Sequence, residues 1–154
     1  MGYLFILRHG PVVRKNHHRE LDHNEYKKIV HRIVRIINKY DNVDIIYTSP
    51  IDRCIDTAVI LNKYFDVRIK KTDNLLRCGE GQVKCSKRLR NCKKFGKKIA
   101  RYDDNVLIVT HSSVIRGVMN GVSGKKIKKF KVNRASLTIY DKDREKFVVY
   151  NKGF

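Results

Sequence analysis

The chain has 154 residues, of which 35 are Lys or Arg and 15 are Asp or Glu, so its formal net charge is +20. This length is typical of one domain, which we expect over residues 1–154, and 42% hydrophobic residues suffice for one core, which excludes a wholly disordered protein. The positive charge predicts anionic partners, whether phosphate groups, nucleic acid or an acidic surface.

The first predicted element is a strand at 3–7, because YLFIL is a continuous apolar run that stops at the turn residues RHGP of 8–11. Residues 11–24 are polar and are expected to form a loop. Asp22 followed three residues later by Glu25 indicates the start of a helix, and apolar residues continue it at helical spacing.

The middle of the chain alternates strands with helices. A strand is predicted at 44–48, and Ser49 and Pro50 are expected as the N-cap and the first position of the helix that follows it. A short strand is predicted at 67–70. A basic helix is predicted over 83–101, with a buried stripe formed by Cys85, Leu89, Cys92, Phe95 and Ile99.

The last third is predicted to contain a buried strand at 106–110, a short helix at 113–120, and a strand pair at 136–140 and 147–150. Strands that alternate with helices need crossover connections. We therefore expect an α/β fold, a three-layer sandwich in which a mostly parallel mixed sheet carries helices on both faces. In such sheets, ligands bind beyond the carboxyl ends of the strands.

Four basic side chains are expected at that edge of the sheet. Arg8 and His9 follow the first strand, Arg53 lies in the first turn of a helix, and His111 follows the strand at 106–110. A guanidinium binds phosphate oxygens in pairs, and an imidazole near neutral pH can act as a nucleophile. The sequence therefore predicts a phosphate pocket that contains a candidate nucleophile.

Three segments lie at these positions: Leu7 to Gly10, Thr48 to Ala58, and Val109 to Arg116. In order and spacing they resemble the signature segments of the histidine phosphatase superfamily, also called phosphoglycerate-mutase-like. The resemblance runs from residue 3 to about residue 140. It implies the phosphoglycerate-mutase-like fold and a phosphatase that uses neither a metal nor a cofactor.

The resemblance also implies a role for each matching residue. His9 would attack phosphorus and carry the phosphoryl group as phosphohistidine until water removes it. Arg8, Arg53 and His111 would hold the phosphate oxygens and stabilise the charge of the transition state. Ser112 is expected to contribute to substrate binding, and Asn16 is assigned to the position of a phosphate-contacting asparagine.

The chain departs from the family at the expected general acid. Arg77 stands where family members commonly have Glu, so Glu80 is the substitute candidate. Small members that act on phosphohistidine have a similar Cys-Gly-acid run, which favours a phosphoprotein substrate with phosphohistidine as one candidate group. A phosphatase for a small polyanionic metabolite, and a non-catalytic module that binds nucleic acid or a phospho-ligand, remain the alternatives.

Two basic blocks lie outside these motifs. Nine basic residues fall in Lys84 to Arg101 and six in Lys125 to Arg134, with no acidic residue in either block. The default interpretation is a solvated face, and the alternative is contact with a polyanion. The histidines at 17, 18 and 23 are assigned to a polar loop rather than a metal site, because no Cys or carboxylate accompanies them at ligand spacing.

No apolar run approaches the roughly 18 residues of a membrane span, so we expect no membrane contact and a cytoplasmic or nuclear location. The four cysteines are Cys54, Cys78, Cys85 and Cys92. A chain so well supplied with core residues does not need disulfides, so we expect reduced thiols.

Overall fold

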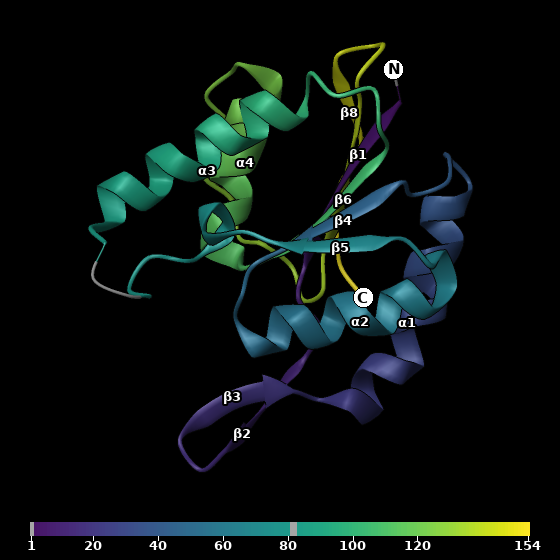
Figure 1. Ribbon diagram of the computed structural model, residues 1–154, viewed down its shortest axis with the longest axis vertical. Coiled ribbons are helices and arrows are strands. Elements are labelled where there is room, and N and C mark those ends of the chain that lie inside the picture. Colours follow the sequence, from purple (N-terminus) through teal and green to yellow (C-terminus); the bar gives the residue numbers. More distant parts are fainter. Residues whose placement is uncertain (1, 81–82) are drawn as a thin grey trace.

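The computed structural model describes residues 2–80 and 83–154. Within these ranges the main sheet has six strands in the order β5-β4-β6-β1-β7-β8, and a separate hairpin pairs β2 with β3 (Figure 1). In chain order the elements are β1 (Tyr3–Arg8), β2 (Val12–Lys15), β3 (His18–Leu21), α1 (His23–Asn38), β4 (Ile45–Thr48), α2 (Asp52–Phe65), β5 (Arg68–Lys71), the 3-10 turn η1 (Asp73–Leu75), α3 (Cys85–Ile99), β6 (Val106–Thr110), α4 (Ser112–Ser123), β7 (Leu137–Asp141) and β8 (Lys146–Lys152).

The predicted three-layer sandwich is confirmed. Strands β5, β4, β6 and β1 are parallel, while β7 and β8 extend the sheet in antiparallel pairing. In β1, Phe5 and Leu7 pack against α1 and α2 on one face of the sheet, whereas Leu4 and Ile6 pack against α3 and α4 on the other. Alternate residues of one strand therefore supply both cores, as the period of two in a β-strand requires.

The register of the central strands brings three chain segments together at one edge. Arg8 of β1 pairs with Thr110 of β6, and Thr48 of β4 pairs with Val109 of β6. The carboxyl ends of the three strands are therefore level. Whatever follows each strand meets at this edge.

The loop expected over 11–24 is wrong in part, because residues 12–21 form the β2–β3 hairpin. Asn16 and His17 make the two-residue turn, and both have positive φ, 47° and 66°. That geometry matches the right-handed twist of paired strands, and Asn tolerates it better than most residues do. The expected start of α1 is confirmed, since the Asp22 carboxylate accepts a hydrogen bond from the backbone N–H of Glu25 (3.1 Å).

The expected buried stripe of α3 is also wrong in part. Cys92, Phe95 and Ile99 are buried, but Cys85 is exposed and Leu89 is 45% exposed. Cys85 forms a disulfide with Cys78, which corrects the expectation of four reduced thiols; Cys54 and Cys92 remain free and buried. At its N-terminal end the helix is held by this covalent link and by the buried Arg88 rather than by apolar packing.

Glycines set the distance between α3 and α4. A Cβ on Gly96 would collide with the backbone of Val118, and one on Gly121 would collide with the backbone of Lys93. The two helices therefore approach each other more closely than larger side chains would allow.

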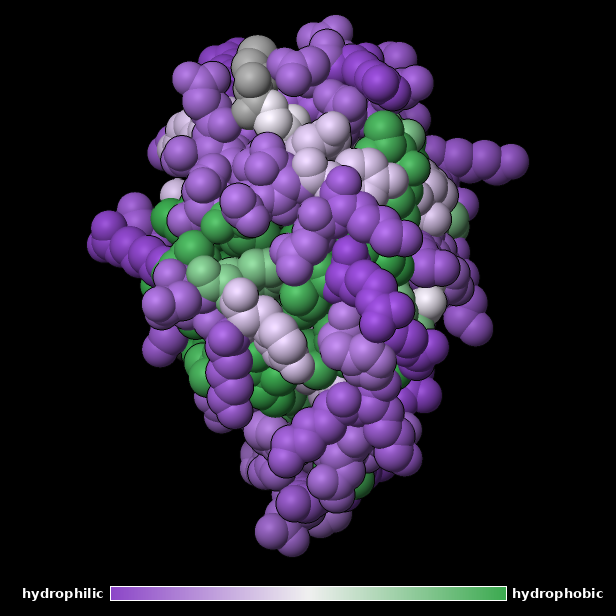
Figure 2. All heavy atoms as spheres, turned by 90° about the vertical axis from the view of Figure 1, so that its right-hand side faces the viewer, coloured by the Kyte–Doolittle hydropathy of each residue, from purple (hydrophilic) through white to green (hydrophobic). Residues whose placement is uncertain are grey.

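Hydrophilic side chains cover most of the face seen in Figure 2, and apolar atoms are visible between them. Among the described residues, no helix combines the length and the apolar composition needed to cross a membrane.

Candidate active site

His9 lies directly after β1, at the edge where the three strands end. Its backbone N–H donates to the carbonyl of Thr110 (2.9 Å), and its Nδ1 lies 2.8 Å from the carbonyl oxygen of Gly10. A carbonyl can only accept a hydrogen bond, so Nδ1 carries the proton and Nε2 keeps a free lone pair. The backbone thus selects the tautomer that makes Nε2 a nucleophile.

Burial is the main cause that lowers the pKa of His9 from 6.5 to about 4, and the positive charges of Arg53 and Arg8 act in the same direction. Only 8% of the His9 surface is exposed. At neutral pH the imidazole is therefore uncharged and able to attack an electrophile.

His111 stands opposite His9, at the N-cap position of α4. The two ring centroids are 5.6 Å apart and the ring planes meet at 67°. Nδ1 of His111 accepts a hydrogen bond from Nη2 of Arg53 (3.3 Å), so its proton is on Nε2, which donates to Oγ of Ser49 (2.8 Å). Burial, followed by the charge of Arg53, lowers the pKa of His111 to about 3.

The two histidines therefore hold opposite tautomers. The lone pair of His9 is on Nε2, whereas His111 carries its proton there. One ring therefore offers a lone pair at Nε2, and the other offers an N–H donor there.

Two guanidinium groups flank the histidines. Arg53 is 8% exposed and lies in the first turn of α2, while Arg8 ends β1 and donates through Nη1 to the carbonyl of Val132 (3.0 Å). Burial lowers the pKa of both side chains below the ordinary value, but a guanidinium remains a cation at neutral pH.

One buried hydroxyl joins the segments that carry His9 and Arg53. Oγ1 of Thr57 donates to the carbonyl of Arg53 (2.7 Å) and accepts from the N–H of Gly10 (3.0 Å). Gly10 has to be glycine, since a Cβ there would collide with Tyr26 and Leu21. The turn after β1 is therefore fixed against α2 on one side and against the core on the other.

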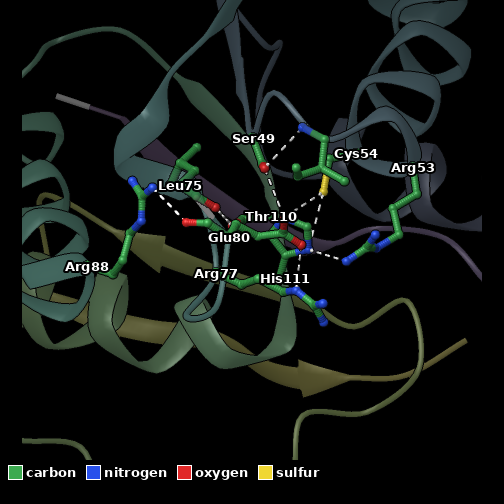
Figure 3. A network of polar contacts seen from close by, with 10 residues as sticks. Ser49, Arg53, Cys54, Leu75, Arg77, Glu80, Arg88, Thr110 and His111 are labelled. Atoms are coloured by element: carbon green, nitrogen blue, oxygen red, sulfur yellow. Dashed lines mark hydrogen bonds and ion pairs between the residues drawn. The ribbon is translucent and has the colours of Figure 1, made fainter. Parts of the chain in front are cut away.

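Glu80 is engaged in an ion pair. Its Oε1 accepts from Nε of Arg77 at 2.9 Å, and Figure 3 shows this pair beside His111 and Arg53. The buried Arg88 donates to the carbonyls of Glu80 (2.9 Å) and Asp73 (3.3 Å), which attaches this segment to α3. The positive charge of Arg77 also contributes to the lowered pKa of His111, so this residue belongs to the site.

The site opens into two hollows on the surface. One, of about 440 Å³, is lined by Arg8, His9 and Arg134; the other, of about 480 Å³, is lined by Arg19, Arg53 and Glu80. Arg19 lies on β3, and its charge lowers the pKa values of Arg8, His9 and Arg53. The β2–β3 hairpin thus forms one wall of the pocket, on which Glu20 accompanies Arg19.

Two helices begin next to the histidines. The N-caps of α2 and α4 are Ile51 and His111, and neither side chain caps its helix with a hydrogen bond. First-turn N–H groups and the positive end of the helix dipole favour an anion at such a start. Ser112, the first residue of α4, is half-buried beside His111.

The structure does not bring every predicted residue together. Asn16 is exposed at the tip of the β2–β3 hairpin and lines neither hollow. Among residues 2–80 and 83–154, no group of three or more His, Cys, Asp or Glu side chains is arranged to hold a metal ion. Cys54 lies against His111, but burial raises the pKa of its thiol to about 12, so it stays protonated.

Ser49, Thr57 and Arg19 were missed as site residues in the sequence. Ser49 was expected to cap α2, but the helix begins at Asp52 and the hydroxyl contacts His111 instead. Arg19 was missed because the β2–β3 hairpin was expected to be a loop. Asn16 is a residue type favoured in two-residue hairpin turns and could have indicated the hairpin.

No protein-family model matches the chain, and no curated protein matches it. Solved structures do, and three of them have TM-scores of 0.70 to 0.71. Phosphoserine phosphatase of Entamoeba histolytica is 16% identical with a TM-score of 0.71, and the match covers 99% of this chain and 98% of that one. A mycobacterial glucosyl-3-phosphoglycerate phosphatase is 14% identical with a TM-score of 0.70 and 99% of both chains covered. YhfR of Bacillus stearothermophilus is 17% identical with a TM-score of 0.70, covering 98% of this chain and 96% of that one. The chain thus shares its fold with these phosphatases, as the resemblance of its three segments implied.

Proposed function

We propose that this protein is a metal-independent phosphatase that works through a phosphohistidine intermediate on His9. The observation that carries the proposal is the hydrogen bond from Nδ1 of His9 to Gly10, which leaves Nε2 as a nucleophile among cationic groups. The fold shared with phosphoserine and glucosyl-3-phosphoglycerate phosphatases supports it.

In the first step, Nε2 of His9 attacks phosphorus, the N–P bond forms, and the bond to the leaving oxygen or nitrogen breaks. Arg8 and Arg53 hold the phosphoryl oxygens, with Ser112 contributing at the start of α4. His111 turns its Nε2 proton from Ser49 to a phosphoryl oxygen. All of these groups are donors, so they stabilise the charge that spreads over the oxygens in the transition state.

In the second step, water attacks phosphorus and the N–P bond breaks. The electron pair returns to Nε2 of His9, and both protons of the water leave with the phosphate. The hydrogen bond to Gly10 keeps Nδ1 protonated throughout, so the nucleophile is regenerated in its starting tautomer.

The leaving group is where substrate classes differ. While Glu80 is paired with Arg77, its carboxylate accepts hydrogen bonds and has no proton to give. This favours a leaving group that needs little protonation, such as the imidazole of a phosphohistidine protein. The second candidate is a small phosphorylated metabolite with a further anionic group. The similarity to phosphoserine phosphatase and glucosyl-3-phosphoglycerate phosphatase supports it, and Arg19 is a cation that could bind the further group.

Hydrolysis of an aryl phosphate tests the reaction. His9→Ala should abolish turnover, whereas His31→Ala, at an exposed position of α1, should leave it unchanged. Rapid acid-free quenching of the unaltered enzyme should trap phosphate that is stable to base and labile to acid, as phosphohistidine is. Unchanged turnover in His9→Ala would remove His9 as the nucleophile.

A substrate panel distinguishes the two candidates. Phosphohistidine peptide, phosphoserine, 3-phosphoglycerate and an inositol phosphate should be compared by kcat/KM beside Glu80→Gln. If phosphohistidine is the substrate, Glu80→Gln should change kcat by less than about threefold. A dominant oxygen ester whose turnover collapses in Glu80→Gln would make Glu80 the general acid and exclude the phosphohistidine candidate.

A further inference from the structure

A third hollow, also of about 480 Å³, lies apart from the two hollows of the site, between α3 and strands β4 and β5. It is lined by lysines from two elements and by two tyrosines, with polar side chains between them: Tyr47, Lys70, Lys71, Thr72, Asn74, Asn91, Lys94, Phe95, Lys98 and Tyr102. No Asp or Glu lines it. None of the residues assigned to catalysis lines it either, so its chemistry is separate from the phosphatase pocket.

The four lysines of this hollow are uncompensated. Lys71, Lys94 and Lys98 are exposed and Lys70 is half-buried. Across residues 2–80 and 83–154, no ion pair involves any of these four lysines or any other basic residue of α3. Burial is the main cause that raises the pKa of the lining residue Tyr47; the charge of Asp104 acts in the same direction, and the charges of Lys98 and Arg68 oppose it.

The cations continue across α3. Lys94 and Lys98 lie on the side of the helix that faces β5, while Lys93, Lys97 and Arg101 line a hollow of about 700 Å³ beside α4, where Glu145 is the acidic residue. At a rise of 1.5 Å per residue, α3 (Cys85–Ile99) spreads its exposed basic side chains over about 21 Å. Repulsion between these like charges destabilises the helix in the free protein, whereas a bound chain of phosphates would neutralise them.

The tyrosines indicate which polyanion fits. Tyr47 and Tyr102 are both half-buried in the hollow, and Tyr47 packs edge-on against Phe95 at a centroid distance of 5.4 Å, which holds its ring in place. A ring fixed between lysines offers a face on which an unpaired base can stack, while Asn74 and Asn91 can hydrogen-bond to base edges. An anionic membrane would use apolar side chains for insertion, and the large exposed apolar side chain of α3 is Leu89 alone.

We propose that this face binds single-stranded nucleic acid, with phosphates on Lys70, Lys71, Lys94 and Lys98 and a base stacked on Tyr102 or Tyr47. The strand then crosses α3 toward Lys93, Lys97 and Arg101. This gives the basic block at Lys84 to Arg101 a ligand of its own, distinct from the substrate of the pocket at His9.

Fluorescence anisotropy with a labelled 15-nucleotide oligo-dT tests the proposal across a series of salt concentrations. The variant Lys70→Gln, Lys71→Gln, Lys94→Gln, Lys98→Gln should flatten the slope of log K against log salt by about 3 units, since each phosphate contact on a single strand contributes about 0.7. The matched control removes four exposed lysines elsewhere, at positions 27, 39, 63 and 146, and should change the slope by less than 1 unit. If both variants flatten the slope equally, binding depends only on the net charge of the protein, and the proposal is overturned.

The stacking part has its own test. Tyr102→Ala should weaken binding roughly 5- to 150-fold, as expected for the loss of one stacked base, while Tyr102→Phe should bind nearly as well as the unaltered protein. Unchanged binding in both Tyr102→Ala and Tyr47→Ala would refute base stacking. Competition by polyglutamate at equal charge concentration should be weak, and competition as strong as that of oligo-dT would assign the face to an acidic protein instead. Hydrolysis of an aryl phosphate should be unaffected by the four-lysine variant, so failure here is distinguishable from failure of the proposed phosphatase.

Discussion

Acidification should destabilise this fold through the two buried histidines of the site. The pKa values of His9 and His111 are about 4 and about 3 in the folded protein, against 6.5 for an exposed imidazole. Below pH 6.5 these two imidazoles bind protons in the unfolded chain, whereas in the folded protein they remain neutral until the pH is much lower. Stability is therefore complete above about pH 7 and is lost as the pH falls toward 4.

The magnitude follows from the same values. At pH 5 an unfolded imidazole is almost fully protonated while both folded imidazoles remain almost fully neutral. At 1.36 kcal/mol per pKa unit, each histidine then lowers the free energy of unfolding by about 2 kcal/mol relative to pH 7. The sum of about 4 kcal/mol is a large part of the 5–15 kcal/mol typical of a folded domain.

Urea unfolding followed by circular dichroism at pH 7, 6 and 5 measures this loss. His9→Gln and His111→Gln should each remove about half of it, because glutamine does not titrate. His31→Gln, at an exposed position of α1, is the matched control and should keep the full dependence. An equal free energy of unfolding at pH 7 and pH 5, or an unchanged dependence in both site variants, would refute the assignment of neutral buried imidazoles.

Arg53→Lys should weaken vanadate binding at least tenfold by calorimetry, because an ammonium cannot contact two oxygens as a guanidinium fork does; equal affinity would place Arg53 outside the phosphate pocket. Thr57→Val should lower kcat for an aryl phosphate at least tenfold, with rescue in Thr57→Ser, because only a hydroxyl can bond both Gly10 and Arg53. Cys78→Ser should lower the free energy of unfolding by about 2 kcal/mol, the value expected for a loop of this length, and a reductant should then have no further effect. Gly121→Ala should lower the melting temperature by several degrees, since its Cβ has to displace the backbone of Lys93; an unchanged value would contradict the close helix contact.

The elements that could be predicted from sequence are those with strong periodicity. The strand predicted at 106–110 matches β6, and the ends of α1 and α4 lie within a few residues of expectation, because apolar spacing and capping reflect local physics. Four residues could be predicted together because each ends or directly follows a strand, or lies in the first turn of a helix, at the same edge of the sheet. These residues are Arg8, His9, Arg53 and His111.

What could not be predicted depends on contacts distant in sequence. On α3 the buried position is that of Arg88 and not that of Leu89, which is exposed. The guanidinium of Arg88 is buried because it donates hydrogen bonds to the carbonyls of Glu80 and Asp73, 8 and 15 residues away in the sequence. The hydroxyl of Ser49 bonds to His111, which lies 62 residues later in the sequence. The local sequence pattern of Ser49 and Pro50 instead favoured a helix N-cap at Ser49. The disulfide could not be predicted from composition, because composition says only that a bridge is unnecessary and nothing about which thiols meet.

The length of the β2–β3 hairpin can change without moving the catalytic candidates Arg8 and His9. Leu21 is buried beside Gly10 and fixes the base of the hairpin, so the place of Arg19 is counted from that end. The two-residue turn at the other end is exposed, and residues added there in pairs would extend the ladder without altering which face each side chain occupies. The hairpin can therefore become longer or shorter over evolution, so that the pocket admits narrower or wider substrates, while Arg8 and His9 keep their positions.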